Sequence, residues 1–338
     1  MGYPDTFEGF CVDSPQSWNK FHKAELIPKP FDDSDIDVQI ECCGVCGSDV
    51  HTVTGGWGDF EGPLCVGHEV VGRAVRVGKN VKLVKNGDGV DVGAQVWSCL
   101  KCELCKNKNE NYCPYLILTT LSTPMVERLT AVGPITSART TGITTYSPLV
   151  RAGIGSGKTV AVLGIGGLGH LGLQWASALG AETYALTHSP GKAADAKKLG
   201  AKEVIVTSEK NWAEPWAFRF DFILNCADTT DSLDIKTYLS TLKVGGQFHM
   251  VGIPNKPLPE MAAMIFTTNA AKLTGSHLGN RQEMEAMLKL AADKGIAPMV
   301  ETLDISEAGC KEAVERVEEN KVRYHFTLTG FEKASGRK

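Results

Sequence analysis

Three observations predict an α/β fold that combines a β-rich domain with a doubly wound parallel sheet. Residues 1 to about 115 contain short β-type runs separated by glycines. Between about 158 and 300, apolar strands alternate with helical patterns, which is typical of parallel strands joined by crossover helices. Residues 301–338 return to strand-like segments. A chain of 338 residues is long enough for two domains of ordinary size.

The strand signals in the first part are short and irregular. Valine-rich runs occur at 37–42, 69–78 and 89–96, and glycines punctuate them. Such spacing predicts an irregular β domain or a partial barrel. The middle part instead repeats a strand followed by a helix. Its expected strands are 159–163, 183–186, 203–206, 220–225 and 247–251, and helices are expected after Gly169 and around 192–199.

The composition excludes several classes of function. The net charge is −4, with Lys and Arg mixed among Asp and Glu, whereas a nucleic-acid binder carries a basic stripe. No apolar run approaches the ~18 residues of a membrane span. The amino terminus lacks the basic head and apolar stretch of a secretory signal. We therefore expect a cytoplasmic protein without nucleic-acid or membrane partners, in which eleven cysteines need an explanation other than disulfides.

Four cysteines form a C-x2-C-x2-C-x7-C pattern at Cys99, Cys102, Cys105 and Cys113. Four thiolates within 15 residues can surround one zinc ion and leave no position open for substrate. The pattern therefore predicts a structural zinc site whose binding energy folds its own loop. An iron–sulfur cluster also accepts four thiolates, and a chance cluster without metal is the third interpretation.

A second candidate metal site combines Cys46 with His68 and Glu69. One Cys, one His and one Glu suit a catalytic zinc ion, which keeps a coordination position open. Ser48 and His51 follow Cys46 closely and are expected to pass a proton from an alcohol to solvent. The alternative is that Cys46 is a small core residue and His68 a structural histidine. The remaining Cys42, Cys43 and Cys65 fit no motif and are interpreted as packed apolar residues.

The sequence GIGGLG follows the apolar strand at 159–163 and opens a helical run. This context is the one required of a dinucleotide-binding fingerprint. Gly164 is expected to make the tight turn, Gly166 to let the backbone approach a pyrophosphate, and Gly169 to allow close packing of helix on strand. The residues expected to contact the cofactor are Gly164, Gly166, Gly167, Leu168 and Gly169. A tight turn without any ligand is the alternative.

The residues after the second expected strand favour NADPH over NADH. NAD binders usually place Asp or Glu there to bind the ribose 2′-hydroxyl. This chain has Thr187, His188 and Ser189 instead, with Lys192 nearby. A hydroxyl and a cation suit a 2′-phosphate. In the alternative interpretation, Lys192 is a solvated helix residue.

Taken together, these motifs resemble those of the zinc-dependent medium-chain alcohol dehydrogenases, and more narrowly the cinnamyl-alcohol branch with its fungal NADP-dependent relatives. The segments that carry the resemblance are GVCGSDVH at 44–51, GHEVVG at 67–72, the four-cysteine lobe at 99–113, 144–172 and VRYHFTLTG at 322–330. The resemblance implies a GroES-like catalytic domain, built from both ends of the chain, and a Rossmann domain. We expect the first at 1–150 and the second at 151–298, with 299–338 returning to the catalytic domain.

The resemblance also implies roles for individual residues. Cys46, His68 and Glu69 align with catalytic-zinc positions, and Ser48 and His51 with the proton relay. Trp57 matches an aromatic residue of the substrate pocket, Ser189 and Lys192 fall in the phosphate-binding stretch, and Ser276 falls in a loop near the nicotinamide. Two zinc sites, NADP(H), an aldehyde or alcohol substrate and a homodimer are the expected ligands and assembly.

Residues 114–141 depart from the family pattern. The family has a third zinc-ligand cysteine before the glycine that corresponds to Gly142, but this chain has Thr140 and Thr141 there. The stretch is also shorter than expected, and we interpret it as a frame-shifted or mis-spliced translation. A hydroxyl is a poor zinc ligand beside a thiolate. A chain without the third thiolate is expected to be weakly active or inactive, unless Glu69 binds zinc or Cys43 or Cys65 moves into the site.

Three functions remain open at this point. The first is an NADPH-linked zinc aldehyde reductase or alcohol dehydrogenase, with an apolar or aromatic substrate or a role in a secondary-metabolite pathway. The second is a catalytically impaired relative that keeps NADP binding and the structural zinc. The third, a zinc-loop interaction module, is disfavoured by the complete dinucleotide fingerprint.

Overall fold

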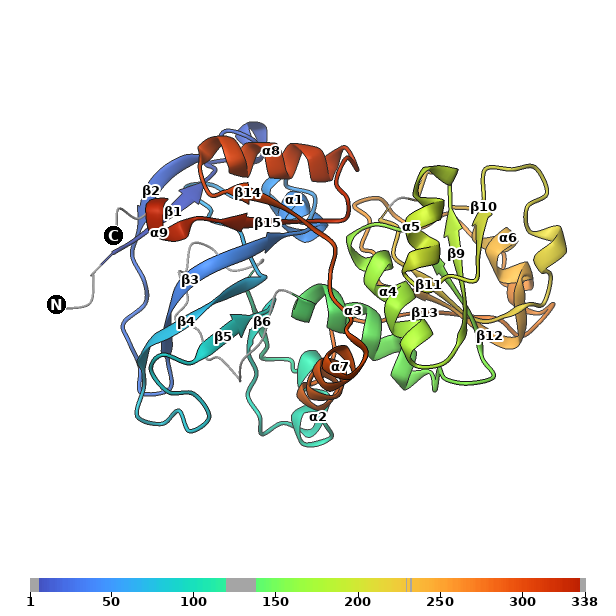
Figure 1. The fold of residues 1–338 in the computed structure, drawn as a ribbon, viewed down its shortest axis with the longest axis horizontal. Helices are drawn as coiled ribbons and strands as arrows, with labels where there is room; N and C mark the ends of the chain where they lie inside the picture. Colours follow the sequence, from blue (N-terminus) through green and yellow to red (C-terminus); the bar gives the residue numbers. More distant parts are fainter. Residues whose placement is uncertain (1–5, 120–137, 229, 232, 335–338) are drawn as a thin grey trace. The chain divides into compact units, whose positions relative to one another are not determined.

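The chain forms two folding units, and the first of them contains both ends of the chain. The first unit comprises Met1–Thr140 and Met299–Lys338, and the second comprises Thr141–Pro298. The computed structural model in Figure 1 describes residues 6–119, 138–228, 230–231 and 233–334, with the side chains of 138–140 excepted. The two ends of the chain therefore belong to one unit, as the family resemblance implies.

The first unit is rich in β-structure. A five-stranded sheet has the order β14-β15-β3-β4-β5, and β1–β2 and β6–β7 form two-stranded sheets. The strands are β1 (Phe7–Cys11), β2 (His22–Leu26), β3 (Ile36–Val45), β4 (Val70–Val77), β5 (Gly89–Val92), β6 (Gln95–Trp97), β7 (Ile117–Leu118), β14 (Val300–Asp304) and β15 (His325–Thr329). Its helices are α1 (Gly47–Val53), α2 (Glu103–Lys106), α8 (Glu307–Glu318) and α9 (Phe331–Ala334), with 3-10 turns η1 (Pro15–Ser17) and η2 (Glu110–Tyr112).

The carboxy-terminal strand β15 lies between β14 and β3 in this sheet (Figure 1). It pairs antiparallel with β3, so that Phe326 is opposite Val45 and Leu328 is opposite Cys43. An apolar cluster that includes Val45, Phe326 and Val314 of α8 supports this junction. This pairing places the end of the chain next to the residues that precede Cys46.

The second unit is a doubly wound parallel sheet. Its strand order is β10-β9-β8-β11-β12-β13, and every neighbouring pair is parallel. This is the 3-2-1-4-5-6 order of a dinucleotide-binding fold, with the first strand at β8. The strands are β8 (Thr159–Leu163), β9 (Glu182–Thr187), β10 (Glu203–Val206), β11 (Phe220–Asn225), β12 (Leu242–Met250) and β13 (Lys272–Gly275).

Helices cover this sheet and enclose its core. They are α3 (Ala138–Arg151), α4 (Gly167–Ala178), α5 (Ala193–Lys198), α6 (Ile235–Ser240) and α7 (Arg281–Lys294), with 3-10 turns η3 (Pro190–Lys192), η4 (Glu214–Trp216) and η5 (Ala263–Phe266). All five residues of β8 are buried, as expected for a central strand between two helical layers. Aromatic side chains such as Tyr184, Phe220 and Phe248 fill one core cluster.

The fold class expected from the sequence is confirmed. The runs at 37–42, 69–78 and 89–96 lie on β3, β4 and β5–β6, and the five expected Rossmann strands are β8 to β12. Residues 141–150, which we expected in the first domain, lie in the second unit. The physical reason is the packing of α3, whose Tyr146 ring meets Trp175 of α4 edge-on at 5.7 Å. The helix α8 is a further difference, because only strand-like segments were expected within 301–338.

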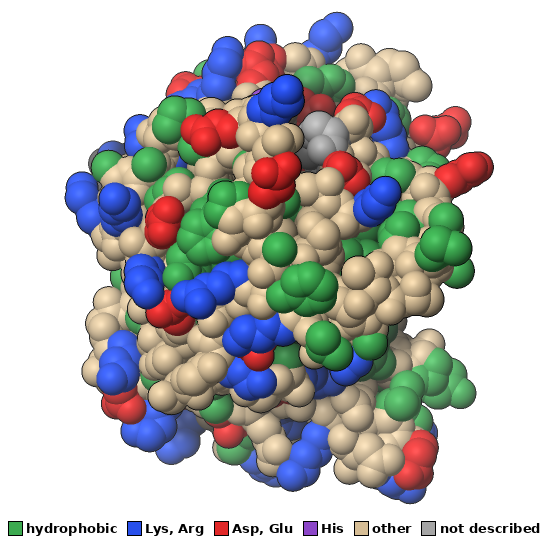
Figure 2. All heavy atoms as spheres, turned by 90° about the vertical axis from the view of Figure 1, so that its right-hand side faces the viewer, with side chains coloured by type: hydrophobic (Ala, Val, Ile, Leu, Met, Phe, Trp, Pro, Cys, Tyr) green, Lys and Arg blue, Asp and Glu red, His purple; other side chains and the backbone are tan. Residues whose placement is uncertain are grey.

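Charges of both signs are distributed over the surface that Figure 2 shows. Lys and Arg side chains lie among Asp and Glu and among apolar side chains on that face. Within the described parts of the chain, no helix is both long and apolar enough to cross a bilayer.

Candidate active site

Cys46 lies at the junction of β3 and α1. It is the residue before the first turn of α1, and its sulfur accepts a hydrogen bond from the Ser48 backbone N–H at 3.3 Å. The Asp49 carboxylate accepts a bond from the Cys46 backbone N–H at 3.0 Å, which closes a reciprocal cap. Backbone N–H groups at a helix start favour negative charge. These two hydrogen bonds therefore fix the position of the Cys46 sulfur at the start of α1.

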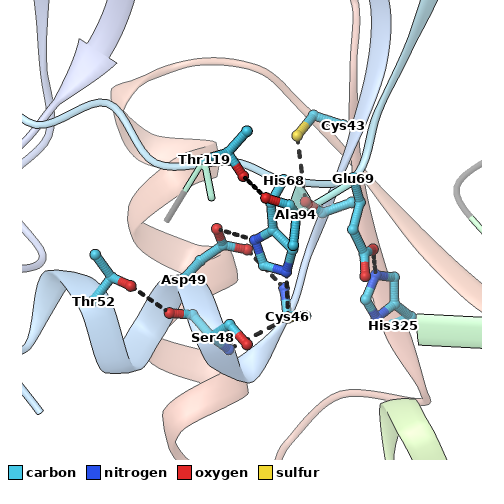
Figure 3. Close-up of polar contacts among 11 residues, drawn as sticks. Cys43, Cys46, Ser48, Asp49, Thr52, His68, Glu69, Ala94, Thr119 and His325 are labelled. Carbon is cyan, nitrogen blue, oxygen red and sulfur yellow. Dashed lines mark hydrogen bonds and ion pairs between the residues drawn. The ribbon is translucent and has the colours of Figure 1, made fainter. Parts of the chain in front are cut away.

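His68 is held between Asp49 and Cys46, as Figure 3 shows. Its Nδ1 donates to Asp49 Oδ1 at 2.9 Å, and its Nε2 lies 3.0 Å from Cys46 Sγ. Burial opposes protonation, but the Asp49 and Cys46 charges raise the pKa of His68 well above its ordinary value. A histidine whose Nδ1–H is fixed by a carboxylate presents Nε2 to a metal ion.

Glu69 points away from Asp49 and toward His325 of β15 (Figure 3). The two buried side chains form a close ion pair, and Glu69 raises the pKa of His325 against the effect of burial. Gly44 on β3 leaves room for this pair, because a Cβ there would overlap Glu69 Oε2 and lie 2.8 Å from His325 Nε2. The pairing of β15 with β3 therefore determines where the Glu69 carboxylate lies.

The donor atoms of Cys46, His68 and Glu69 fit a zinc ion. One ligand atom from each lies within 4.8 Å of the others. Atoms bound to one zinc ion at about 2.0–2.3 Å lie within about 4.6 Å of one another, so small movements would bring all three into range. Three protein donors leave a coordination position for water or substrate. Sulfur, imidazole and carboxylate are donors that zinc accepts in catalytic sites.

Cys43 and Cys65 are outside this donor group. Among the described residues the two groups able to hold a metal are Cys46, His68 and Glu69, and the four cysteines of the lobe. The Cys43 thiol instead donates to the Gly44 carbonyl at 3.4 Å and is buried. Cys65 is exposed, so our interpretation of it as a packed apolar residue is wrong. Its sulfur lies near Gly9 rather than near Cys46.

Ser48, His51 and Trp57 lie on α1 and the turn after it. Ser48 and His51 are three positions apart and so share one side of the helix. The Trp57 ring lies beside His51, with centroids 5.3 Å apart. The structure therefore places a hydroxyl and an imidazole on the helix that follows Cys46, with an indole ring beside the imidazole.

The four-cysteine lobe is already arranged as a metal site. The sulfur atoms of Cys99 and Cys113 are 3.6 Å apart, and those of Cys99 and Cys105, and of Cys102 and Cys113, are 3.9 Å apart. In a tetrahedron with zinc–sulfur bonds of about 2.3 Å, sulfurs are about 3.8 Å apart. The match supports a closed four-thiolate site.

The protonation of the lobe also points to a cation. Backbone hydrogen bonds near Lys101 and Cys102 lower the pKa of Cys99 to about 6, whereas desolvation and the neighbouring cysteines raise that of Cys105 to about 12. The Cys99 thiol therefore loses its proton readily, whereas the Cys105 thiol keeps its proton until a bound divalent cation displaces it.

The glycine motif makes a tight link between β8 and α4. Gly164 has φ +84°, and a Cβ there would lie 2.9 Å from the Ala227 nitrogen. A Cβ at Gly169 would overlap the Gly164 carbonyl oxygen. Gly166 precedes the first turn of α4, which begins with Gly167 and Leu168. The backbone at the start of this long helix is therefore free of side chains that would block an anionic ligand.

Lys192 reaches the glycine motif from the segment after β9. Its Nζ donates to the Ile165 carbonyl at 3.0 Å, and Ser189 begins the 3-10 turn that carries it. Thr187 Oγ1 donates to the Ser189 carbonyl at 3.1 Å, which fixes this turn to the end of β9. His188 and Ser189 are exposed. A cation thus lies close to the start of α4, and an exposed hydroxyl lies three residues before it in the same turn.

A cavity of about 800 Å³ opens beside these residues within the second unit. Its lining includes Gly164, His188, Trp212 and Tyr238. The cavity lies at the carboxyl ends of β8 and β9, where doubly wound sheets bind their ligands. The Trp212 and Tyr238 rings in a lining that also contains polar side chains such as Asn211 are suited to a flat heterocycle that forms hydrogen bonds.

Ser276 follows the edge strand β13 and contacts a buried histidine. Its hydroxyl lies 2.8 Å from His249 Nε2, and Thr274 Oγ1 lies 2.8 Å from His249 Nδ1. Burial lowers the pKa of His249 to about 4, so the ring is neutral at physiological pH. The neutral ring therefore links two hydroxyl groups at the end of the sheet.

Sequence reasoning missed Asp49, His325 and His249. The reciprocal cap at Cys46 was a signal for Asp49, because an acid three positions after a cap residue often bonds back to it. Nothing in the local sequence pairs His325 with Glu69, since 256 positions separate them. Most of the unusual stretch 114–141 lies outside the described residues, which resume at 138. Within the second unit, Thr141 is buried on α3.

Comparisons with known proteins agree with this architecture. A family model described as zinc-binding dehydrogenase matches residues 167–293, and one described as alcohol dehydrogenase GroES-like domain matches 32–146. The chain is 41% identical to NADP-dependent alcohol dehydrogenase 6 of Saccharomyces cerevisiae, a match that covers 98% of this chain and 99% of that protein. The match extends over 359 residues, more than the 338 of this chain, so this chain lacks residues that the yeast protein has.

Two further relatives span most of the chain. An aldehyde reductase of Escherichia coli, YahK, is 37% identical over 87% of this chain and 90% of its own length. Among solved structures, a cinnamyl alcohol dehydrogenase of Sorghum bicolor is similar with a TM-score of 0.87 and 29% identity, over 98% of this chain and 99% of that one.

Replacing Cys105 with serine tests the lobe. We expect Cys105→Ser to reduce zinc by about one ion per chain and to increase protease cleavage within 95–115, because metal binding folds this loop. Zinc content by mass spectrometry and limited proteolysis measure both effects. Cys42→Ser is the control and should change neither. Full zinc content with unchanged cleavage would mean that the lobe is not a metal site.

Replacing Asp49 with asparagine tests the support of His68. The expected result is a zinc affinity about 10–100-fold lower at the Cys46 site, because ligand histidines depend on such carboxylate partners. Competition with a chromogenic chelator measures the affinity, and the lobe ion serves as an internal reference. Asp59→Asn, at an exposed position of the same unit, should leave both ions in place. Unchanged affinity in Asp49→Asn would contradict this role of the carboxylate.

Proposed function

Because the chain belongs to the zinc-dependent medium-chain alcohol dehydrogenase family, we propose that it transfers hydride between NADPH and an aldehyde or alcohol. The observation that carries the proposal is the pairing of two features in one chain. One is the open set of zinc donors Cys46, His68 and Glu69, and the other is the glycine motif at the start of α4. A dehydrogenase needs both, whereas a binding module needs only one.

The first unit would supply the groups around the reacting oxygen. Cys46, His68 and Glu69 would hold a zinc ion, which when bound acts as a Lewis acid toward a carbonyl oxygen. The Ser48 hydroxyl donates a proton to the developing alkoxide, and His51 replaces it from solvent. The His51 ring lies beside Trp57, which we assign to the wall of the substrate pocket. An indole wall favours apolar or aromatic aldehydes.

The second unit would bind the cofactor. The pyrophosphate lies against the start of α4, where Gly166, Gly167, Leu168 and Gly169 offer backbone rather than bulky side chains. The cavity beside Gly164 takes the adenosine half. Ser189 and Lys192 bind the ribose 2′-phosphate, and the absence of an acidic residue at the end of β9 removes the group that would select NADH. Ser276, fixed by His249, contacts the nicotinamide end.

Two finer statements complete the proposal. The chain forms a homodimer through the edge strand β13, which offers an unpaired side of the sheet in the second unit. It acts in the cytoplasm, where a reducing environment keeps the metal-binding thiols available. Light scattering on purified protein and fractionation of cells test these two statements separately.

The related proteins favour this enzyme over a catalytically impaired relative. The yeast relative is named an NADP-dependent alcohol dehydrogenase and the Escherichia coli relative an aldehyde reductase. Glu69 also lies within reach of the other two donors, which offers a third ligand in place of the cysteine that 114–141 lacks.

The decisive experiment is NADPH oxidation by zinc-loaded protein with a panel of aromatic and aliphatic aldehydes. We expect turnover with two zinc ions per chain, and a loss of at least ~100-fold in Cys46→Ser, which removes a donor of the open site. Cys42→Ser should retain full activity. Binding of NADPH without turnover of any aldehyde would instead support the impaired relative.

Lys192→Ala tests the cofactor preference. The variant should bind NADPH about 10–100-fold more weakly and NADH almost unchanged, since a charge-assisted bond to phosphate contributes ~1.5–3 kcal/mol. Fluorescence titration with both cofactors measures the affinities. Lys197→Ala, an exposed lysine on α5, is the matched control. An equal loss for both cofactors would assign Lys192 to positioning the glycine motif through Ile165.

A further inference from the structure

Cys11 and Cys65 lie opposite each other across a short antiparallel bridge in the first unit. Val12 and Leu64 exchange two backbone hydrogen bonds, from Val12 N to Leu64 O at 3.1 Å and from Leu64 N to Val12 O at 2.9 Å. The neighbouring pair in such a ladder is Cys11 and Cys65, and it is a non-hydrogen-bonded pair. Directly opposite residues of that kind have Cα atoms about 4.5 Å apart, which is within the range that disulfides span.

The two side chains point to the same face of this bridge. Gly9 and Cys11 are two positions apart on β1 and therefore share a face of the strand. A Cβ built on Gly9 would lie 2.9 Å from Cys65 Sγ, so the Cys65 sulfur is over that face. A hydrogen bond with Cys65 is the first cause, before burial, that raises the pKa of the Cys11 thiol. The two thiols are thus in contact while both are reduced.

We propose that Cys11 and Cys65 are a redox modification site, which closes to a reversible disulfide on exposure to a low-molecular-weight disulfide such as oxidised glutathione. The site is separate from both metal centres, since neither sulfur belongs to a metal-binding group. It does not depend on the proposed enzymatic activity. Transient disulfides of this kind occur in redox-sensing proteins of otherwise reducing compartments.

Because the two thiols differ in burial, we expect Cys65 to react first with the oxidant and Cys11 to close the disulfide. Cys65 is exposed, whereas Cys11 has no exposed surface. The Cys65 thiolate attacks one sulfur of glutathione disulfide, which forms a mixed disulfide and releases one glutathione thiolate. The Cys11 thiol then gives up its proton to the released glutathione thiolate as its sulfur attacks the Cys65 sulfur, and the second glutathione leaves. Two protein thiols lose two protons and two electrons, and one glutathione disulfide is reduced to two glutathiones.

The other cysteines outside the metal-binding groups do not offer this arrangement. Cys43 and Cys310 are buried, and burial raises the pKa of the Cys226 thiol above its ordinary value. Cys42 is on β3, where its opposite residue on β4 is Val71. The chain therefore contains one exposed thiol with a second thiol directly opposite it.

Formation of the disulfide between Cys11 and Cys65 is expected to increase thermal stability. It joins the end of β1 to the segment that reaches His68 three residues later. A disulfide that closes a loop of this length restricts the unfolded chain, so we expect the apparent melting temperature to rise by about 5–10 °C. Because zinc loss would lower the melting temperature, the direction of the shift separates the two effects.

The test uses the zinc-loaded full chain treated with glutathione disulfide and then alkylated. We expect non-reducing peptide mapping to find Cys11 linked to Cys65 in most of the protein, with zinc content unchanged and full reversal by dithiothreitol. In Cys11→Ala the expected product is a stable glutathione adduct on Cys65, because the resolving thiol is gone. Cys65→Ser, at an exposed position, should show neither product.

Cys42→Ser is the matched control and should behave like the original chain. A lasting glutathione adduct on Cys65 of the original chain, with no linked peptide, would overturn the proposal. So would oxidation confined to the lobe cysteines with release of zinc. Both readouts are independent of aldehyde turnover, so failure of the proposed enzymatic function would not affect them.

Discussion

The burial of two carboxylates beside His68 is the constraint on which the first unit depends. Asp49 and Glu69 are only 2% and 1% exposed, and a buried charge is costly unless other groups compensate it. Asp49 is compensated by His68 and by the backbone of Cys46, and Glu69 by His325. Each compensating contact fixes an atom of the donor set. The same contacts that compensate these charges therefore orient the side chains that we assign to the zinc ion.

This constraint explains why the chain must return to its first unit. His325 is on β15, and β15 reaches Glu69 only by inserting between β14 and β3. Without that strand the buried Glu69 carboxylate would lose its ion pair with His325. Gly44 completes the requirement, since any side chain there would occupy the space of the ion pair. The position of β15 in the sheet, the glycine at position 44 and the ion pair between Glu69 and His325 therefore depend on one another.

Features whose geometry depends only on residues close together in the sequence could be predicted from the sequence. The glycine motif at 164–169 and the cysteine spacing at 99–113 are short patterns whose geometry depends on their own residues. In the structure the glycines lie at the start of α4 and the four sulfurs lie close together. The strands β8 to β12 were predictable because each is a short apolar run. His325 and α8 were not, because their environments are created by tertiary pairing. The role of Asp49 was predictable only in part. Its hydrogen bond with the Cys46 backbone is local in sequence, but its contact with His68 is not.

The cysteines show that the role of a residue cannot be predicted from its type alone. The same thiol belongs to the four-cysteine lobe at Cys99, to the group with His68 and Glu69 at Cys46, to the buried core at Cys310 and to a facing pair at Cys65. The C-x2-C-x2-C-x7-C spacing distinguishes the lobe, because it places four cysteines in one short loop, where pairs of sulfurs lie 3.6–3.9 Å apart. The pair at Cys11 and Cys65 has no such signature, since 54 positions separate its members. Only strand register brings them together, and register is a property of the folded sheet.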